Sequence, residues 1–266
     1  MIRDEKLQKL RTILSEAGSG VVALSGGTDS VFLVWVASEI KALRLLAVTV
    51  NSPYMFGSEV SEAIKFCGSH GIDHKQLIMG IPEAVKNNPP ERCYLCKREV
   101  MSLIKGEAVK GEFRYVFDGT NSDDVSDYRP GMKALKEFGV RSPLLEAGLN
   151  KEEIRALSKE AGLPTWDKPS NACLMTRFPH GTAISPDELR KAEAAEEILS
   201  GLGMTGSRVR VHGDVVRIEC RKEHMEALLE EKLRSNISEG LKALGYSYIT
   251  VDLEGYRTGS MNRKIE

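Results

Sequence analysis

The chain has 266 residues, 41% of them hydrophobic and 28% charged, which is the balance of a folded protein with one large domain or two modest ones. Its formal net charge of −1 gives no general positive field, so nucleic acid is not expected as a partner. The chain has no run of 18 apolar residues and no signal-peptide core, and its five cysteines are an odd number. We therefore expect no membrane span and a reduced, cytoplasmic protein.

The first part of the chain alternates short apolar runs with helical patterns. The expected elements are a helix over 3–17, a strand over 21–24, a helix from 31, a strand over 45–50, a helix over 58–67, strands over 76–79 and 115–117, and a helix over 151–161. This alternation predicts an α/β fold with a doubly wound parallel sheet. Ligands of such sheets bind at the carboxyl ends of the strands.

After residue 180 the pattern changes to that of a small α+β domain. The expected elements are a helix over 186–202, strands over 208–211 and 215–219, a long helix over 223–244, and a strand over 248–253. We therefore expect two domains, residues 1–180 and 181–266, the second of them smaller.

Residues 25–30, Ser-Gly-Gly-Thr-Asp-Ser, join the first strand to the following helix. Backbone N–H groups at a helix N-terminus bind phosphate, and glycines let it approach closely. Asp29 would repel phosphate unless Mg²⁺ lies between them. The segment lacks the lysine of the Walker loop and the G-x-G-x-x-G of dinucleotide folds. A plain glycine turn is the alternative.

This segment resembles the pyrophosphate loop (PP-loop) of ATP pyrophosphatases, which cut ATP between its α- and β-phosphates. Polar residues that end the neighbouring strands extend the expected site. We expect ATP to contact the following residues: Ala23, Ser25, Gly26, Gly27, Thr28, Asp29, Ser30, Asn51, Gly119 and Asn121.

Cys93 and Cys96 lie three residues apart at the start of a predicted helix, so both sulfurs share one face. Two unrelated thiols, a redox pair and part of a zinc site are the alternatives, but the parallel sheet argues against the second and a zinc site needs four ligands. Cys173, late in the first domain, supplies a third sulfur. Three thiolates without a fourth protein ligand suit a [4Fe-4S] cluster with one open iron. Cys67 and Cys220 are expected to be packing thiols.

With these residues in view, the chain resembles the LarE family, ATP-dependent sulfur transferases that make the nickel-pincer nucleotide of lactate racemase. The matching segments are residues 25–30, 118–121, 127–131, 166–173, 177–181, 208–210 and 255–257. The resemblance implies adenylation of a carboxylate of pyridinium-3,5-biscarboxylic acid mononucleotide and its conversion to a thiocarboxylate. It also implies a homo-oligomer, with a hexamer as one candidate, assembled through the small domain.

The family has two branches that differ in the source of sulfur. In one branch a single cysteine at the position of Cys173 gives up its sulfur and becomes dehydroalanine. In the other branch three cysteines hold a [4Fe-4S] cluster. Because this chain has Cys93 and Cys96 as well, it resembles the cluster branch. The sequence indicates no sulfide source.

Arg208 and Arg210 alternate on one predicted strand, so both project from the same face and suit a phosphate monoester. We expect them to bind the substrate phosphate together with Arg257 and Arg177; a solvated basic strand face is the alternative. The remaining expected site residues are Cys173, Lys97, Asp29 and Glu196 as catalytic residues, Asp29 as the Mg²⁺ ligand, Asp127, Tyr128 and Arg129 near the substrate, and Tyr54 and Phe56 either beside adenine or packed in the core.

Two other functions compete with this interpretation. A tRNA thiolase is also a PP-loop enzyme with three cysteines, but it needs a polyanion-binding surface. A non-catalytic iron–sulfur or zinc-binding module that keeps the PP-loop as a scaffold is the second.

Overall fold

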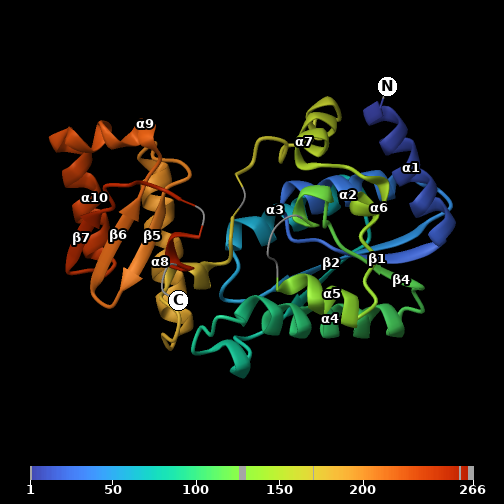
Figure 1. Cartoon of the computed structure of the whole chain (residues 1–266), viewed down its shortest axis with the longest axis horizontal. Coiled ribbons are helices and arrows are strands. Elements are labelled where there is room, and N and C mark those ends of the chain that lie inside the picture. The colour runs from blue at the N-terminus through green and yellow to red at the C-terminus, as the bar shows by residue number, and fades with distance from the viewer. Residues whose placement is uncertain (1, 126–129, 170, 258, 263–266) are drawn as a thin grey trace. The chain divides into compact units, whose positions relative to one another are not determined.

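A computed structural model of the chain describes residues 2–125, 130–169, 171–257 and 259–262 (Figure 1). The chain divides into two compact units. The first comprises Met1–Ala84 and Glu91–Asn171, and the second comprises Val85–Pro90 and Ala172–Glu266. Among the described helices, none has both the length and the apolar character needed to cross a bilayer.

The first unit contains a four-stranded parallel sheet. Its strands are β1 (Ser19–Ala23), β2 (Arg44–Asn51), β3 (His74–Ile78) and β4 (Tyr115–Phe117), in the order β3-β2-β1-β4. The order reverses between β1 and β4, so the carboxyl ends of these two strands form the switch point where ligands of open α/β sheets bind. The predicted doubly wound sheet is confirmed.

Helices cover both faces of this sheet (Figure 1). They are α1 (Ile2–Ala17), α2 (Thr28–Ser38), α3 (Gly57–Ser69), α4 (Arg92–Lys110), α5 (Gly131–Glu137), α6 (Pro143–Ala147) and α7 (Lys151–Glu160), with 3-10 turns η1 (Glu83–Val85) and η2 (Ser122–Val125). Helices α4 and α5 pack on one face, and α1, α2, α3, α6 and α7 pack on the other.

The central strand β1 shows why its sequence is a continuous apolar run. Val21 and Val22 are both fully buried, and they belong to the hydrophobic clusters on opposite faces of the sheet. Successive side chains of a strand point to opposite faces, so a strand covered on both faces needs apolar residues at every position. Burial on both sides holds β1, and with it the loop that follows, in the middle of the unit.

The second unit contains a smaller sheet of β5 (Arg208–His212), β6 (Val215–Glu219) and β7 (Tyr248–Val251), in which β5 and β6 are antiparallel and β6 and β7 parallel. Its helical elements are η3 (Leu174–Arg177), α8 (Pro186–Gly201), α9 (Lys222–Met225), η4 (Ala227–Leu229), α10 (Glu231–Ala243) and η5 (Ser260–Asn262). Ser185 and Glu188 form a capping box that starts α8.

The structure corrects one predicted element. The single helix expected over 223–244 is instead α9, η4 and α10, because Glu230 has an extended backbone (φ −70°, ψ 124°) and α10 begins after it. The sequence contains no glycine or proline there to signal the break.

The second unit includes the segment Val85–Pro90 and resumes at Ala172, earlier in the sequence than the predicted boundary at residue 180. Asn88, fully buried, donates from Nδ2 to the carbonyl oxygens of Met175, Phe178 and Pro179 at 3.2, 3.0 and 2.9 Å. These bonds attach residues 175–179 to the segment Val85–Pro90, so both segments belong to the second unit.

Candidate functional site

Residues 25–30 form a tight turn between β1 and α2. Ser30 Oγ accepts from the backbone N–H of Ser25 at 3.2 Å, lies 3.1 Å from Ser25 Oγ, and donates to the carbonyl oxygen of Gly27 at 3.0 Å. Gly27 is the N-cap of α2 and provides no side-chain cap. The N–H groups of the first turn of α2 have no carbonyl partner within the helix, so they are available to an anion.

Two glycines hold this turn against its neighbours. Gly26 has a left-handed backbone (φ +82°), and a Cβ there would lie 2.4 Å from the carbonyl oxygen of Glu59. A Cβ on Gly119, in the loop after β4, would lie 3.0 Å from the backbone nitrogen of Ser30. Glycine is therefore required at both positions for the loops after β1 and β4 to come together at the switch point.

Asp29 faces the same point from the first turn of α2. Its Oδ2 accepts from Asn121 Nδ2 at 3.3 Å, whereas its buried Oδ1 has no hydrogen-bond partner among the residues that the structure describes. Burial raises the pKa of the Asp29 carboxyl, and nearby Lys151 opposes that rise. A buried carboxylate oxygen without a partner fits a hard divalent cation, so these residues suit Mg²⁺.

The other residues expected to contact ATP lie at the same edge of the sheet. Ala23 ends β1 and Asn51 ends β2, while Asn121 is fully buried in the turn after β4. Asp118, which begins that turn, accepts hydroxyl hydrogen bonds from Thr120 and Ser142 at 2.5 and 2.6 Å. The predicted ATP residues are thus brought together at the carboxyl ends of β1, β2 and β4.

Tyr54 and Phe56 follow β2 but are buried, with 2% and 8% of their surfaces exposed. The Tyr54 hydroxyl accepts a hydrogen bond from the Cys96 thiol at 3.2 Å. Of the two interpretations from sequence, the burial of both rings favours packing over lining of an adenine pocket.

The cysteines fall into both units. Cys93 is exposed and Cys96 half-buried in the first turns of α4, while Cys173, at the N-cap of η3, belongs to the second unit. Burial raises the pKa of the Cys96 thiol, and the Tyr54 hydrogen bond and Lys97 oppose the rise. Over the described ranges, no group of three or more His, Cys, Asp or Glu side chains is arranged to hold a metal. The thiols have the donor chemistry of an iron–sulfur site, and their grouping as three ligands stays a prediction.

Cys67 and Cys220 are fully buried, and burial raises the pKa of the Cys67 thiol to about 11. Their predicted role in packing is confirmed. Over the described ranges, no cysteine forms a disulfide.

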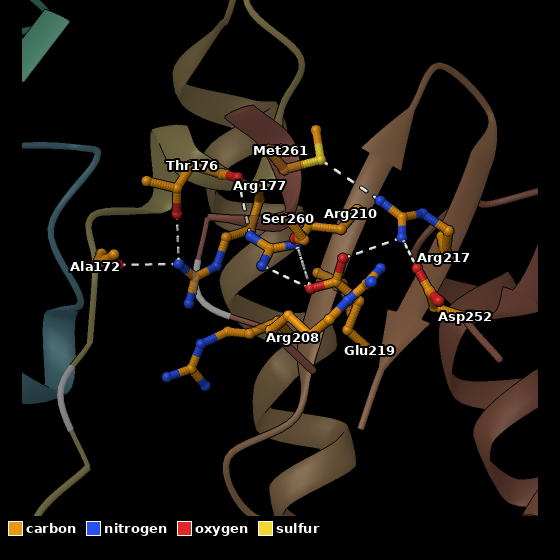
Figure 2. A network of polar contacts seen from close by, with 12 residues as sticks. Ala172, Thr176, Arg177, Arg208, Arg210, Arg217, Glu219, Asp252, Ser260 and Met261 are labelled. Atoms are coloured by element: carbon orange, nitrogen blue, oxygen red, sulfur yellow. Dashed lines mark hydrogen bonds and ion pairs between the residues drawn. The ribbon is translucent and has the colours of Figure 1, made fainter. Parts of the chain in front are cut away.

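The second unit contains a buried ion-pair network, which Figure 2 shows from close by. Arg177, with 1% of its surface exposed, makes a bidentate pair with Glu196, each hydrogen bond being 2.8 Å long. Its Nη1 donates to the Ala172 carbonyl at 3.0 Å and to the Thr176 hydroxyl at 2.7 Å. Glu196 Oε1 also accepts from the backbone N–H of Val209 at 3.1 Å.

Arg210 is held by a second carboxylate, that of the fully buried Glu219, at 2.9 and 2.7 Å. Figure 2 shows Glu219 between Arg210 and Arg217, and Arg217 donates to it at 3.0 Å and also pairs with Asp252. Arg210 Nη1 donates in addition to the Thr176 carbonyl at 3.0 Å.

Arg208 lies beside the same glutamate as Arg177. Its Nη1 donates to the Ser207 carbonyl at 3.0 Å and lies 3.8 Å from Glu196 Oε2. Burial lowers the pKa of Arg208; Glu196 opposes that effect, and Arg177 and Arg210 add to it. Because Arg208 and Arg210 expose only 7% and 5% of their surfaces, the alternative of a solvated basic strand face is wrong.

The last expected arginine, Arg257, lies in the loop after β7. Tyr256 places its ring 5.6 Å from the Arg208 guanidinium carbon and donates its backbone N–H to Cys220 at 2.8 Å, which attaches this loop to the end of β6. Arg257 itself pairs with Glu254. Asp127, Tyr128 and Arg129 lie outside the described residues.

The sequence analysis missed two groups of residues. Lys168 and Asn171 lie in the segment 166–173 that carries the resemblance, but nothing in the sequence placed them, or Glu59, beside the PP-loop. The position of Glu219 could have been predicted from the sequence, because the turn at Gly213 and Asp214 sets the register in which Glu219 lies opposite Arg208.

A parallel sheet with Ser-Gly-Gly-Thr-Asp-Ser at its switch point defines the class of PP-loop ATP pyrophosphatases, which are enzymes. The comparisons with known proteins agree with this class. The chain is 27% identical over 176 residues to a subunit of the glutamine-hydrolysing GMP synthase of Thermoplasma acidophilum, and the match covers 60% of this chain and 57% of that protein.

Several relatives match almost the whole chain. Pyridinium-3,5-bisthiocarboxylic acid mononucleotide synthase of Lactiplantibacillus plantarum is 34% identical over 244 residues, covering 91% of this chain and 88% of that protein. An uncharacterised protein of Synechocystis is 37% identical over 265 residues, covering 98% of both chains. No family model matches the chain. The chain belongs to the family of the first relative, the LarE family, and is an enzyme.

Proposed function

We propose that the protein is an ATP-dependent sulfur transferase that converts a carboxylate of pyridinium-3,5-biscarboxylic acid mononucleotide into a thiocarboxylate. The observation that carries the proposal is the likeness to the Lactiplantibacillus plantarum synthase across both units of this chain. The PP-loop at the switch point of the sheet supports the use of ATP.

The reaction has two steps, and both balance. A carboxylate oxygen of the substrate attacks the α-phosphorus of ATP, the bond from that phosphorus to the oxygen shared with the β-phosphate breaks, and pyrophosphate leaves. A sulfur nucleophile then attacks the acyl carbon, and AMP leaves with the bonding electrons. Adenylation is needed because a free carboxylate is a poor electrophile.

The proposal assigns ATP to the first unit. The backbone N–H groups of Thr28, Asp29 and Ser30 in the first turn of α2 and the hydroxyl of Ser25 bind phosphate oxygens, and Asp29 would hold Mg²⁺ through its buried Oδ1. Asn121 orients Asp29 through its hydrogen bond to Oδ2. Asn51, Ala23 and Gly119 complete the ATP site at the edge of the sheet.

We assign the sulfur chemistry to Cys93, Cys96 and Cys173, the ligands of a [4Fe-4S] cluster in this proposal. When bound, such a cluster supplies an iron without a protein ligand, which keeps sulfide deprotonated. Lys97 follows Cys96 on α4 and provides a positive charge for the substrate carboxylate or for anionic sulfur.

The substrate phosphate is assigned to Arg208, with Arg210, Arg177 and Arg257 around it. The buried network brings together four guanidinium groups, those of Arg177, Arg208, Arg210 and Arg217. Guanidinium groups bind a phosphate monoester through charge-assisted, bidentate hydrogen bonds. Glu196 acts through the arginines that it orients.

A pyrophosphate exchange assay tests the enzymatic assignment. We expect the anaerobically purified chain to exchange labelled pyrophosphate into ATP only when the biscarboxylate mononucleotide is present. Exchange without that substrate would contradict the proposal. No exchange under either condition would favour the non-catalytic module. A gel shift with bulk tRNA at moderate salt would favour the tRNA thiolase, because electrostatic attraction to the phosphates dominates such binding.

The source of sulfur is tested on the cysteines. We expect about four irons per chain, and loss of iron and turnover in each of Cys93→Ala, Cys96→Ala and Cys173→Ala. If Cys93→Ala kept full activity and mass spectrometry found dehydroalanine at position 173 after turnover, the sacrificial mechanism would replace ours.

We also infer a reducing, cytoplasmic setting, since the thiolate chemistry proposed for the cysteines requires it. A homo-oligomer, a hexamer among the candidates, follows from the family only, and sedimentation of the whole chain measures it. The proposed product is the precursor of the nickel-pincer nucleotide of lactate racemase.

A further inference from the structure

The irregular segment after α7 is attached to the PP-loop. Thr28, in the first turn of α2, donates its hydroxyl to the carbonyl oxygen of Thr165 at 2.6 Å. Arg155 on α7 donates to the carbonyl oxygens of Trp166 and Lys168 at 3.0 and 2.6 Å. These bonds fix the backbone of the segment beside the loop, although about 140 residues of chain separate the two.

The side chain of Lys168 extends from this segment onto the loop itself. Its Nζ donates to the carbonyl oxygen of Gly26 at 3.2 Å and to Glu62 Oε2 at 2.6 Å, and it lies 3.7 Å from Glu59 Oε1. Asn171 Nδ2 donates to the same Glu59 oxygen at 3.1 Å. Only 16% of the lysine side chain is exposed, so the ammonium group is held at the loop.

We propose that Lys168 binds the β- and γ-phosphates of ATP, as the lysine that the PP-loop itself lacks. This inference rests on the proposed function, because it assumes that ATP occupies the loop. The loop sequence contains no cation, and its charged residue, Asp29, is negative. A lysine within hydrogen-bond distance of a loop carbonyl reaches phosphate oxygens seated on the neighbouring N–H groups by a rotation of its flexible stem.

The two glutamates explain how the ammonium is kept in place before ATP arrives. Glu62 exposes 53% of its side chain, so it can move into solvent when the ammonium turns to phosphate. Glu59 is mostly enclosed, and burial raises the pKa of its carboxyl against the opposing effect of Lys168. Lys168 therefore has two roles to separate: contact with the phosphates, and neutralisation of glutamates that would repel them.

Binding of Mg–ATP, AMP and inorganic pyrophosphate to the whole chain, measured by calorimetry, tests the proposal. We expect Lys168→Gln to weaken ATP and pyrophosphate by about ten- to a hundredfold, the loss of a charge-assisted hydrogen bond, and to leave AMP unchanged. Lys168→Arg should recover part of the loss. Lys65→Gln, an exposed change on α3, is the matched control and should change nothing.

A triple variant separates the two roles. If Lys168 contacts phosphate, Lys168→Gln with Glu59→Gln and Glu62→Gln still binds ATP weakly. Full recovery of ATP affinity in the triple variant would overturn the proposal. So would either of two results for Lys168→Gln alone: an equal loss of affinity for ATP and AMP, or an ATP affinity equal to that of the wild type. If the wild-type chain bound no ATP, the proposed function would fail and this inference with it, whereas the other outcomes overturn only the inference.

Discussion

Replacing Glu196 by alanine should destabilise the second unit by at least about 3 kcal/mol. The change removes both carboxylate hydrogen bonds from Arg177, which is 1% exposed, and the partner of the Val209 N–H group. Two charge-assisted hydrogen bonds at about 1.5–3 kcal/mol each, and the cost of about 3–5 kcal/mol for breaking a buried ion pair, agree on this size. Nε and Nη2 of Arg177 would each lose the carboxylate oxygen to which they donate.

Amide hydrogen exchange followed by mass spectrometry measures this loss where it occurs, because both tryptophans, Trp35 and Trp166, lie in the first unit and do not report on the second. Peptides from α8 and β5 should exchange faster by about a hundredfold to a few thousandfold, at about 1.4 kcal/mol per factor of ten. The matched control is Asp187→Ala, which breaks an exposed ion pair with Arg190 on the same helix and should leave exchange unchanged.

The double variant Arg177→Met with Glu196→Leu tests the physical reason. Since a buried ion pair can be replaced by apolar side chains at little cost, the double variant should regain most of the stability that Glu196→Ala loses. It should remain inactive if the pair orients the arginines of the substrate site. Exchange at the wild-type rate in Glu196→Ala would refute the calculation.

Three further predictions concern the first unit. Asp29→Asn should abolish Mg–ATP binding yet raise the melting temperature of the ligand-free chain. Because burial raises the pKa of Asp29, the cost of burying its charge grows as pH rises from the ordinary carboxyl range through the raised pKa, and the variant should become more stable relative to the wild type in that pH window. Thermal melts across pH measure the difference, and a difference that does not change with pH would contradict this prediction. Gly26→Ala should cost at least about 1 kcal/mol in urea unfolding from its left-handed backbone alone, more from the clash with Glu59, whereas Gly27→Ala, whose Cβ would lie 3.5 Å from Ser25 Oγ, should cost less. Cys67 should resist iodoacetamide at neutral pH, since burial raises its pKa to about 11, and Cys67→Ala should keep its iron; rapid labelling of Cys67 in the folded chain would show that its burial is wrong.

The parts of the fold that were predictable from sequence are those set by local patterns. The apolar run at Val21 and Val22 indicated a strand covered on both faces, and the glycines at 26 and 27 marked the turn that follows it. The alternation of Arg208 and Arg210 along the chain also indicated that their side chains lie on one face of a strand. The burial of these two arginines was not predictable from that pattern, because it depends on Glu196 and Glu219, which lie on α8 and β6.

Contacts between distant segments set the limit of the sequence analysis. No periodicity connects Lys168 with Gly26, since their contact depends on how the segment after α7 folds back onto the loop. The break in the predicted helix at Glu230 is similar, because it is a backbone change at a residue whose type permits a helix. Asn88 likewise assigns residues 175–179 to the second unit through bonds that no local pattern reveals.

The proposed anion sites share one electrostatic feature, from which we expect a substitution that strengthens ATP binding, in contrast to Lys168→Gln, which should weaken it. Lys168 is held by Glu59 and Glu62, just as Arg210 is held by Glu219, so an arriving phosphate exchanges one anionic partner for another. The carboxylates keep the cations in place, but they compete with the ligand. Removing the half-exposed competitor in Glu62→Gln should therefore tighten Mg–ATP binding, by up to about fivefold for a screened surface pair worth under about 1 kcal/mol. Calorimetry at low and high salt measures this change, and the gain should shrink as salt screens the pair. Weaker ATP binding in Glu62→Gln would mean that Glu62 positions Lys168 for the phosphate rather than competing with it.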